Sequence, residues 1–174
     1  MNAPTPTFGL PFPIAYASVS LHDLSPEQAV REAAAAGYAG VEWKVGDAPH
    51  AADSTASGPF LSANRCTIPP GPGGAALVRR LAAESGLAVV GLGPYLQVGD
   101  RDGLDAMFDM AVAAGSPQIR FQAPRLGREP FAYAGLAEAT RSYVRAAGSH
   151  AARTGVRFVL ELHHRTIAPS SRFA

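Results

Sequence analysis

The chain has 174 residues, of which 47% are hydrophobic and 17% charged, a composition typical of a globular domain rather than a disordered segment. Its net charge of +1 provides no basic field for a nucleic-acid backbone, so nucleic acid is not an expected partner. No run of about 18 apolar residues is free of Gly, Pro or charge, which argues against a membrane span.

The N-terminal segment and the cysteine content bear on location. Residues 1–10 contain no Lys or Arg and are interrupted by Pro4 and Pro6, so they do not resemble a signal peptide. Cys66 is the single cysteine, and we interpret it as a small buried apolar residue. We therefore expect one cytoplasmic domain spanning residues 1–174.

The first strand–helix unit is predicted from an apolar run and a helix-start pattern. Ile14–Leu21 reads as a strand. Ser25 is expected to cap the N–H of Gln28, while Pro26 suits the first helical position. Gly37 lies just beyond the last apolar position of this helix and is expected to end it.

The same unit recurs along the rest of the chain. Further strands are predicted at Gly40–Val45, Leu87–Leu92, Gln118–Gln122 and Val156–Leu162. Apolar positions at helical spacing predict helices between them, which end at Gly86, at Gly115 and towards Gly155. Residues 46–74 form a long insert after the second strand, interpreted as an active-site loop, with a loop of no function as the alternative.

Alternation of strands and helices predicts an α/β fold with parallel strands and right-handed crossovers. The first strand-to-helix turn, residues 20–24, contains no glycine, which argues against a dinucleotide-binding sheet. A complete (β/α)₈ barrel needs roughly 250 residues. Two architectures fit this pattern, a doubly wound open sheet and a (β/α)₈ barrel. Of these we expect a partial (β/α)₈ TIM barrel, with about five parallel strands and four helices and without the last three βα units.

Alternation within the strands predicts which side chains enter the barrel. Apolar residues on one face should contact the helices, leaving the other face inside. The residues expected to face the helices are Val41, Trp43, Val45, Ile119, Phe121, Phe158, Leu160 and Leu162. The residues expected to face inward are Glu42, Lys44, Arg120, Gln122, Val159, Glu161 and His163.

Glu161 is the main candidate for chemistry. A carboxylate near the end of an inward-facing strand needs a cation, so we interpret Glu161 as a catalytic residue and metal ligand. The alternative is a structural ion pair with Lys44 or Arg120. His163 has the parity to share the inward face, where it could be a metal ligand or take part in a hydrogen bond, whereas His164 is expected in solvent or in a loop.

Several other inward residues are candidates for substrate binding. Lys44 is the only lysine, and it could neutralise a phosphate or, less readily, form a Schiff base. His22, which leaves the first strand at the same rim, could bind hydroxyl groups. The remaining substrate-binding candidates are Glu42, Arg120, Gln122 and His163.

Three segments together resemble the xylose-isomerase-like barrel family of sugar-phosphate isomerases and epimerases: His22–Glu27, Ala36–Trp43 and Val159–His164. The resemblance implies a divalent metal such as Mn²⁺, Mg²⁺, Co²⁺ or Zn²⁺, held by carboxylates and a histidine from strands five to eight. Glu161 matches the first of these ligands. The implied reaction is isomerisation or epimerisation of a sugar or sugar phosphate through an enediolate.

The chain departs from the family pattern because the other implied ligands come from the last three strands. We therefore expect an incomplete metal site, a truncated chain that is inactive alone, and self-association through open sheet edges. The alternatives are a non-catalytic fragment or interaction module, or a lyase or dehydratase on the same barrel. Apurinic-site endonucleases share the barrel, but the near-neutral charge and the lack of a histidine near Tyr95 disfavour DNA repair.

Overall fold

A single parallel sheet forms the centre of the protein. The computed structural model describes residues 12–46, 64–126 and 133–170. Its strands are β1 (Ala15–Ala17), β2 (Gly40–Val45), β3 (Ala88–Pro94), β4 (Gln118–Gln122) and β5 (Arg157–Glu161). They pair in the order of the sequence, each parallel to its neighbour, which confirms the predicted α/β fold with five parallel strands.

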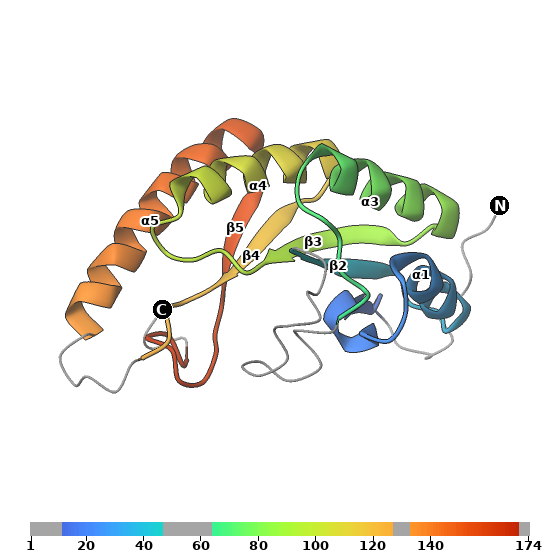
Figure 1. Ribbon diagram of the computed structural model, residues 1–174, viewed down its shortest axis with the longest axis horizontal. Helices are drawn as coiled ribbons and strands as arrows, with labels where there is room; N and C mark the ends of the chain where they lie inside the picture. The colour runs from blue at the N-terminus through green and yellow to red at the C-terminus, as the bar shows by residue number, and fades with distance from the viewer. Residues whose placement is uncertain (1–11, 47–63, 127–132, 171–174) are drawn as a thin grey trace.

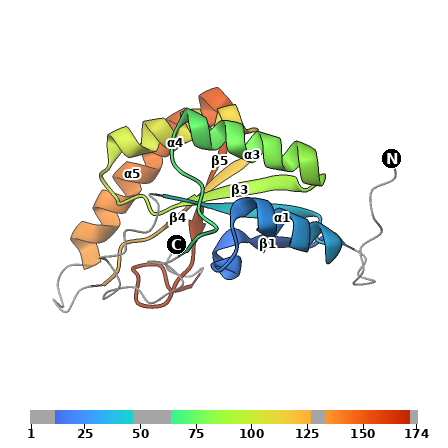
Figure 2. The same ribbon diagram turned by 45° about the vertical axis from the view of Figure 1, so that its right-hand side comes forward.

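The helices lie between successive strands, as predicted. They are the 3-10 helix η1 (Ser18–Leu21) and the α-helices α1 (Pro26–Ala35), α3 (Pro72–Ser85), α4 (Arg101–Ala114) and α5 (Tyr133–Thr154). Helices α3, α4 and α5 follow one another in an arc along one face of the curved sheet (Figures 1 and 2). This arrangement is the wall of part of a (β/α)₈ barrel, with the other face of the sheet turned away from these helices.

The core fills the layer between the sheet and the helices. The apolar face of β2, predicted from alternation, is almost fully buried. Phe121 of β4 stacks on Phe158 of β5 with ring centroids 4.4 Å apart, and Tyr143 of α5 meets both rings edge-on. Burial of these faces leaves the alternate residues of β2 and β4 on the inner face, which confirms the parity argument for these strands. In β5, Phe158 and Leu160 pack against the same core while only partly buried, which agrees with Glu161 facing inward.

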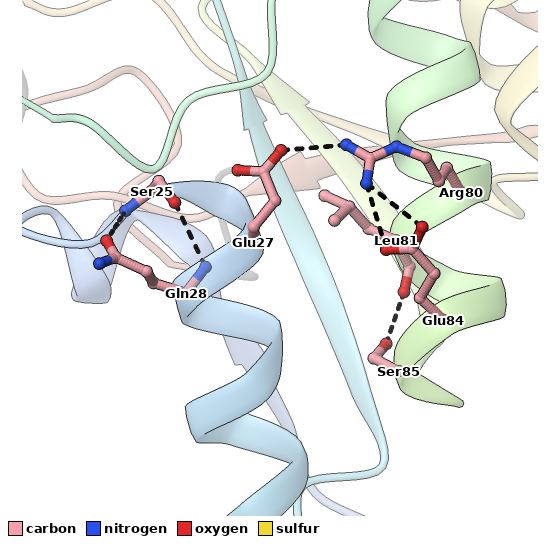
Figure 3. A network of polar contacts seen from close by, with 7 residues as sticks. All are labelled: Ser25, Glu27, Gln28, Arg80, Leu81, Glu84 and Ser85. Carbon is pink, nitrogen blue, oxygen red and sulfur yellow. Dashed lines mark hydrogen bonds and ion pairs between the residues drawn. The ribbon is translucent and has the colours of Figure 1, made fainter.

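The start of α1 confirms the expected capping box. The Ser25 hydroxyl accepts a hydrogen bond from the backbone N–H of Gln28, and the Gln28 side chain accepts one from the Ser25 N–H (Figure 3). Glu27 in the first turn pairs with Arg80 of α3 at 3.0 Å, which joins the two helices. Local sequence thus determines the helix start, whereas the contact with α3 joins residues 53 apart in the chain.

The first strand is shorter than predicted. The run Ile14–Leu21 forms β1 only over Ala15–Ala17 and then turns into η1. The reason is Ser18, whose buried hydroxyl accepts a hydrogen bond from the Lys44 N–H at 2.8 Å and donates one to the Cys66 carbonyl at 3.0 Å. A side-chain hydroxyl therefore takes the place of a backbone partner for Lys44, and the strand ends early.

The insert after β2 returns to the sheet before α3 begins. Residues 47–63 of the predicted insert 46–74 lie outside the described residues. Ile68 forms a parallel bridge with Val45, and Cys66 is fully buried beside it, as expected. The insert is shorter than predicted because α3 begins at Pro72. Glycine is required at position 74, in the first turn of α3, because a Cβ there would lie 1.8 Å from the Pro69 carbonyl oxygen.

None of the helices in the described ranges combines the length and apolar character needed to cross a bilayer.

Candidate active site

Four polar residues meet on the inner face of the sheet; we call them the Arg120 cluster. Arg120 of β4 donates from Nε to Glu42 Oε1 of β2 at 2.9 Å, and its Nη1 pairs with Glu161 Oε2 of β5. Gln122 Nε2 donates to the same Glu161 oxygen at 2.8 Å. The side chains of Glu42, Arg120 and Glu161 are only 20%, 22% and 30% exposed, so these charges are largely shielded from solvent.

Two glycines of β3 leave space for this cluster. β3 lies between β2 and β4, and Gly91 and Gly93 lie on the same face of the sheet as Glu42. A Cβ built on Gly93 would lie 2.7 Å from Arg120 Nη2 and 3.4 Å from Glu42 Oε1. Arg120 therefore reaches across β3 to Glu42 because Gly93 has no side chain.

A cavity of about 720 Å³ lies beyond the cluster, where β3, β4 and β5 end. The polar or aromatic residues lining it are Tyr95, Gln97, Arg120, Gln122, Arg125 and His163. This volume falls within the usual range for small-molecule pockets, and the carboxyl ends of the strands are where parallel barrels bind substrates. The cavity is therefore the candidate substrate site.

Lys44 lies next to this cavity but does not line it. Its Nζ donates to Thr67 Oγ1 at 3.0 Å and lies 5.6 Å from the centre of the Tyr95 ring. Burial lowers the pKa of Lys44. The pKa of Tyr95 is raised, mainly by burial and to a lesser degree by Glu161 and Glu42, while Arg120 opposes the shift. Tyr95 thus lines the cavity and also lies beside the Lys44 ammonium group.

The two histidine candidates have different positions. His22 Nε2 lies 2.9 Å from Asp23 Oδ1 after η1, and His22 is not among the described residues that line the cavity. His163 does line it, with its ring stacked on His164 at a centroid distance of 4.2 Å. Only His163 is therefore placed with Arg120 and Gln122.

The parity prediction fails beyond Glu161. Leu162 was expected against the helices, but it is 44% exposed. β5 ends at Glu161, and the chain then turns back, with the His163 carbonyl accepting hydrogen bonds from both the N–H and the hydroxyl of Thr166. Side-chain alternation requires extended backbone, so it no longer predicts orientation in this turn.

The residues described do not by themselves fit a divalent metal. They contain no group of three or more His, Cys, Asp or Glu side chains placed to hold one. Glu42 and Glu161 are both engaged by Arg120, whose single positive charge offsets part of their negative charge. Oxygen-ligated cations usually need six or more ligands, so at most Glu161 would contribute to a site completed from elsewhere.

Sequence reasoning did not select three residues that line the cavity: Tyr95, Gln97 and Arg125. A signal was present, because each lies within four residues after the end of β3 or β4, at the rim where catalytic groups gather in barrels. Gly91 and Gly93 carried a second signal, since glycines two apart in a strand leave one face of it bare.

The parallel βα wall with polar residues at its carboxyl rim defines a protein of the TIM-barrel class. The profile of the family described as "Xylose isomerase-like TIM barrel" matches residues 30–174. The chain belongs to this family. A comparison with curated protein sequences gives no match.

Solved structures with the same fold include three named proteins. The chain is similar to an IolI protein with a bound zinc atom (10% identity, TM-score 0.59). It is also similar to the 3-keto-D-glucoside 4-epimerase YcjR from E. coli (16%, 0.61) and to the probable 3-DHS dehydratase AsbF from Bacillus anthracis (15%, 0.60). The matches cover 90%, 88% and 90% of this chain but 54%, 57% and 54% of those chains. The chain thus spans little more than half their length.

Proposed function

We propose that the protein takes part in the isomerisation or epimerisation of a sugar or sugar derivative. Both reactions move a proton to or from a carbon beside a carbonyl group, which requires a positioned base. Glu161 is the candidate base: its carboxylate is largely shielded at the end of β5, beside the cavity lined by Gln122 and His163. This placement is the observation that carries the proposal.

Similarity to an epimerase and to a zinc-containing structure supports the same proposal at the level of the family. The proposal includes two expectations about mechanism, an enediolate intermediate and a divalent metal. Glu161 would supply one metal ligand, and the others would come from outside the described residues. Lys44, His22 and Glu42 stay candidates for substrate contact.

Deuterium exchange tests the proposal directly. The full chain is incubated in D₂O with candidate ketoses and with Mn²⁺, Mg²⁺, Co²⁺ or Zn²⁺, and exchange at the carbon beside the carbonyl is followed by NMR. Exchange with at least one sugar and its loss in Glu161→Gln would support the proposal, and would overturn the expectation from the sequence that this chain is inactive alone. Glu138→Gln is the matched control, because Glu138 is an exposed, arginine-paired carboxylate on α5.

The pairing of Glu161 with Arg120 and Gln122 also favours a second candidate, a non-catalytic interaction module in which the cluster is structural. Absence of exchange under all these conditions, in a correctly folded chain, would contradict the catalytic proposal and favour this one. Loss of water from the sugar, detected in the same spectra, would instead indicate a lyase or dehydratase.

A further inference from the structure

Positive charge at the rim of the cavity is concentrated in Arg125. Among the described residues that line the cavity are Arg120 and Arg125 but no Asp or Glu. The charge of Arg120 is already used by Glu42 and Glu161. Arg125 is exposed, and its guanidinium forms no ion pair with a carboxylate in the described ranges. Its charge is therefore available to a bound molecule.

The backbone around Arg125 is held in place by the turn that follows β5. Arg125 forms a bridge with Thr166, the Leu126 N–H donates to the Arg165 carbonyl at 2.8 Å, and the Ile167 N–H donates to the Pro124 carbonyl at 3.0 Å. His163 at the start of this turn also lines the cavity. Arg125 is thus presented from a fixed backbone, which reduces the entropy lost when its side chain binds a ligand.

Charge differs between the inner end of the cavity and its rim. Two carboxylates and one guanidinium leave the Arg120 cluster with an excess of negative charge, which disfavours an anion there. Arg125 is three residues beyond Gln122, a separation of at most about 10 Å along an extended chain. A molecule whose uncharged carbons lie beside the cluster can therefore place an anionic end at Arg125.

We propose that the cavity binds a sugar derivative that carries a phosphate or carboxylate group, and that Arg125 pairs with this group. The planar guanidinium offers two parallel N–H donors, which match the oxygens of either anion. The inference rests on the proposed function in taking this cavity as the substrate site, and it selects the anionic members of the substrate class.

Binding measurements without turnover test it. Isothermal titration of the full chain compares fructose 6-phosphate with fructose, and glucuronate with glucose, in phosphate-free buffer of low ionic strength. We expect the anionic member of at least one pair to bind about ten-fold more tightly or better. The phosphate and carboxylate arms show which anion is preferred. Equal affinity within both pairs, or no binding by any of the four, would overturn the inference.

Variants assign the effect to Arg125. Arg125→Gln should reduce the preference for the anion to about three-fold or less, and Arg125→Lys should retain part of it. Arg157→Gln is the control, because Arg157 is an exposed arginine at the opposite end of β5. An unchanged preference in Arg125→Gln would overturn the assignment. If deuterium exchange occurs but anionic and neutral sugars bind with equal affinity, this inference is refuted and the proposed reaction is not. If binding shows an Arg125-dependent preference for the anionic sugar but no exchange occurs, only the proposed reaction is refuted.

Discussion

A guanidinium shared by two carboxylates dominates the inner face of the sheet at the scale of single residues. Glu161 was interpreted as a metal ligand, with an ion pair to Lys44 or Arg120 as the alternative. The structure places Arg120, not Lys44, against it, and adds Glu42 on the other side of the same guanidinium. The assignment of Glu161 as a metal ligand stays a prediction, because an arginine on one carboxylate oxygen does not determine what the other oxygen binds.

Removal of the shared cation should destabilise the fold. Arg120→Gln leaves two shielded carboxylates without their positive partner, and we expect a loss of about 1–3 kcal/mol in the free energy of unfolding. Urea denaturation monitored by circular dichroism measures it. Arg141→Gln removes an exposed pair with Glu138 and should cost less than about 0.5 kcal/mol. Equal losses in the two variants would contradict the role given to Arg120.

Gly93 should be coupled energetically to Arg120. In Gly93→Ala the added methyl group would lie 2.7 Å from Arg120 Nη2, so the guanidinium must move and its pairs with Glu42 and Glu161 are disturbed, at a cost of about 1 kcal/mol. In an Arg120→Gln background the shorter side chain removes this clash. A double-mutant cycle should therefore give a coupling energy of about 0.5 kcal/mol or more. Strictly additive effects would show that Gly93 does not provide the space for Arg120.

At the scale of elements, a glycine inside a helix and a glycine after its end have different effects on stability. Among the described helices α5 is the longest, with 22 residues. A Cβ added to its Gly148 would meet no atom within 4 Å. Gly155 follows its end with φ of +74°, a conformation that side chains rarely adopt. The same residue type is thus dispensable at one position and required at the other.

A pair of alanine substitutions in and after α5 tests this difference. Gly148→Ala should raise the free energy of unfolding by about 0.5–1 kcal/mol through higher helix propensity. Gly155→Ala should lower it by about 1 kcal/mol, because the left-handed residue that ends the helix becomes strained. Both are measured by thermal or urea unfolding. A destabilising Gly148→Ala would mean that this face of α5 contacts more than the described residues.

At the scale of the whole molecule, the sheet is open on both sides within the described residues. β1 and β5 each pair with one neighbour only. Unpaired strand edges favour association with another strand. Self-association through these edges, inferred from the sequence, stays a prediction, as does the cytoplasmic location.

The buried ionisable groups predict how the stability of the whole fold depends on pH. Burial raises the pKa of the Cys66 thiol and of the Tyr143 hydroxyl to about 12 each, and it raises the pKa of Tyr16 as well. These groups keep their protons in the folded state after the unfolded chain has lost them. Their stabilising contribution is present below the unfolded pKa values and declines as pH rises above about 9. Lys44, with a lowered pKa, acts in the opposite direction.

Tyr16→Phe isolates one of these contributions. The Tyr16 hydroxyl is buried without a hydrogen-bond partner among the described residues, so its removal should not destabilise the protein at pH 7. Between pH 9 and 11 the variant should lose stability less steeply than the natural chain, measured as the urea midpoint at each pH. Tyr133→Phe, at an exposed tyrosine, should show the unaltered slope. An unaltered slope in Tyr16→Phe would contradict this assignment.

Features that follow from local sequence differ from those that depend on residues far apart in the chain. The sequence alone determined the alternation of strands and helices, the capping box of Ser25 and Gln28, and the inward face of β2, β4 and β5. Each depends on residues within one turn or one strand of each other. Folding in three dimensions was needed to bring Arg120 against Glu42, 78 residues away, and against Glu161, 41 residues away. These contacts depend on the register of four strands and on the space above Gly93, which no local pattern specifies.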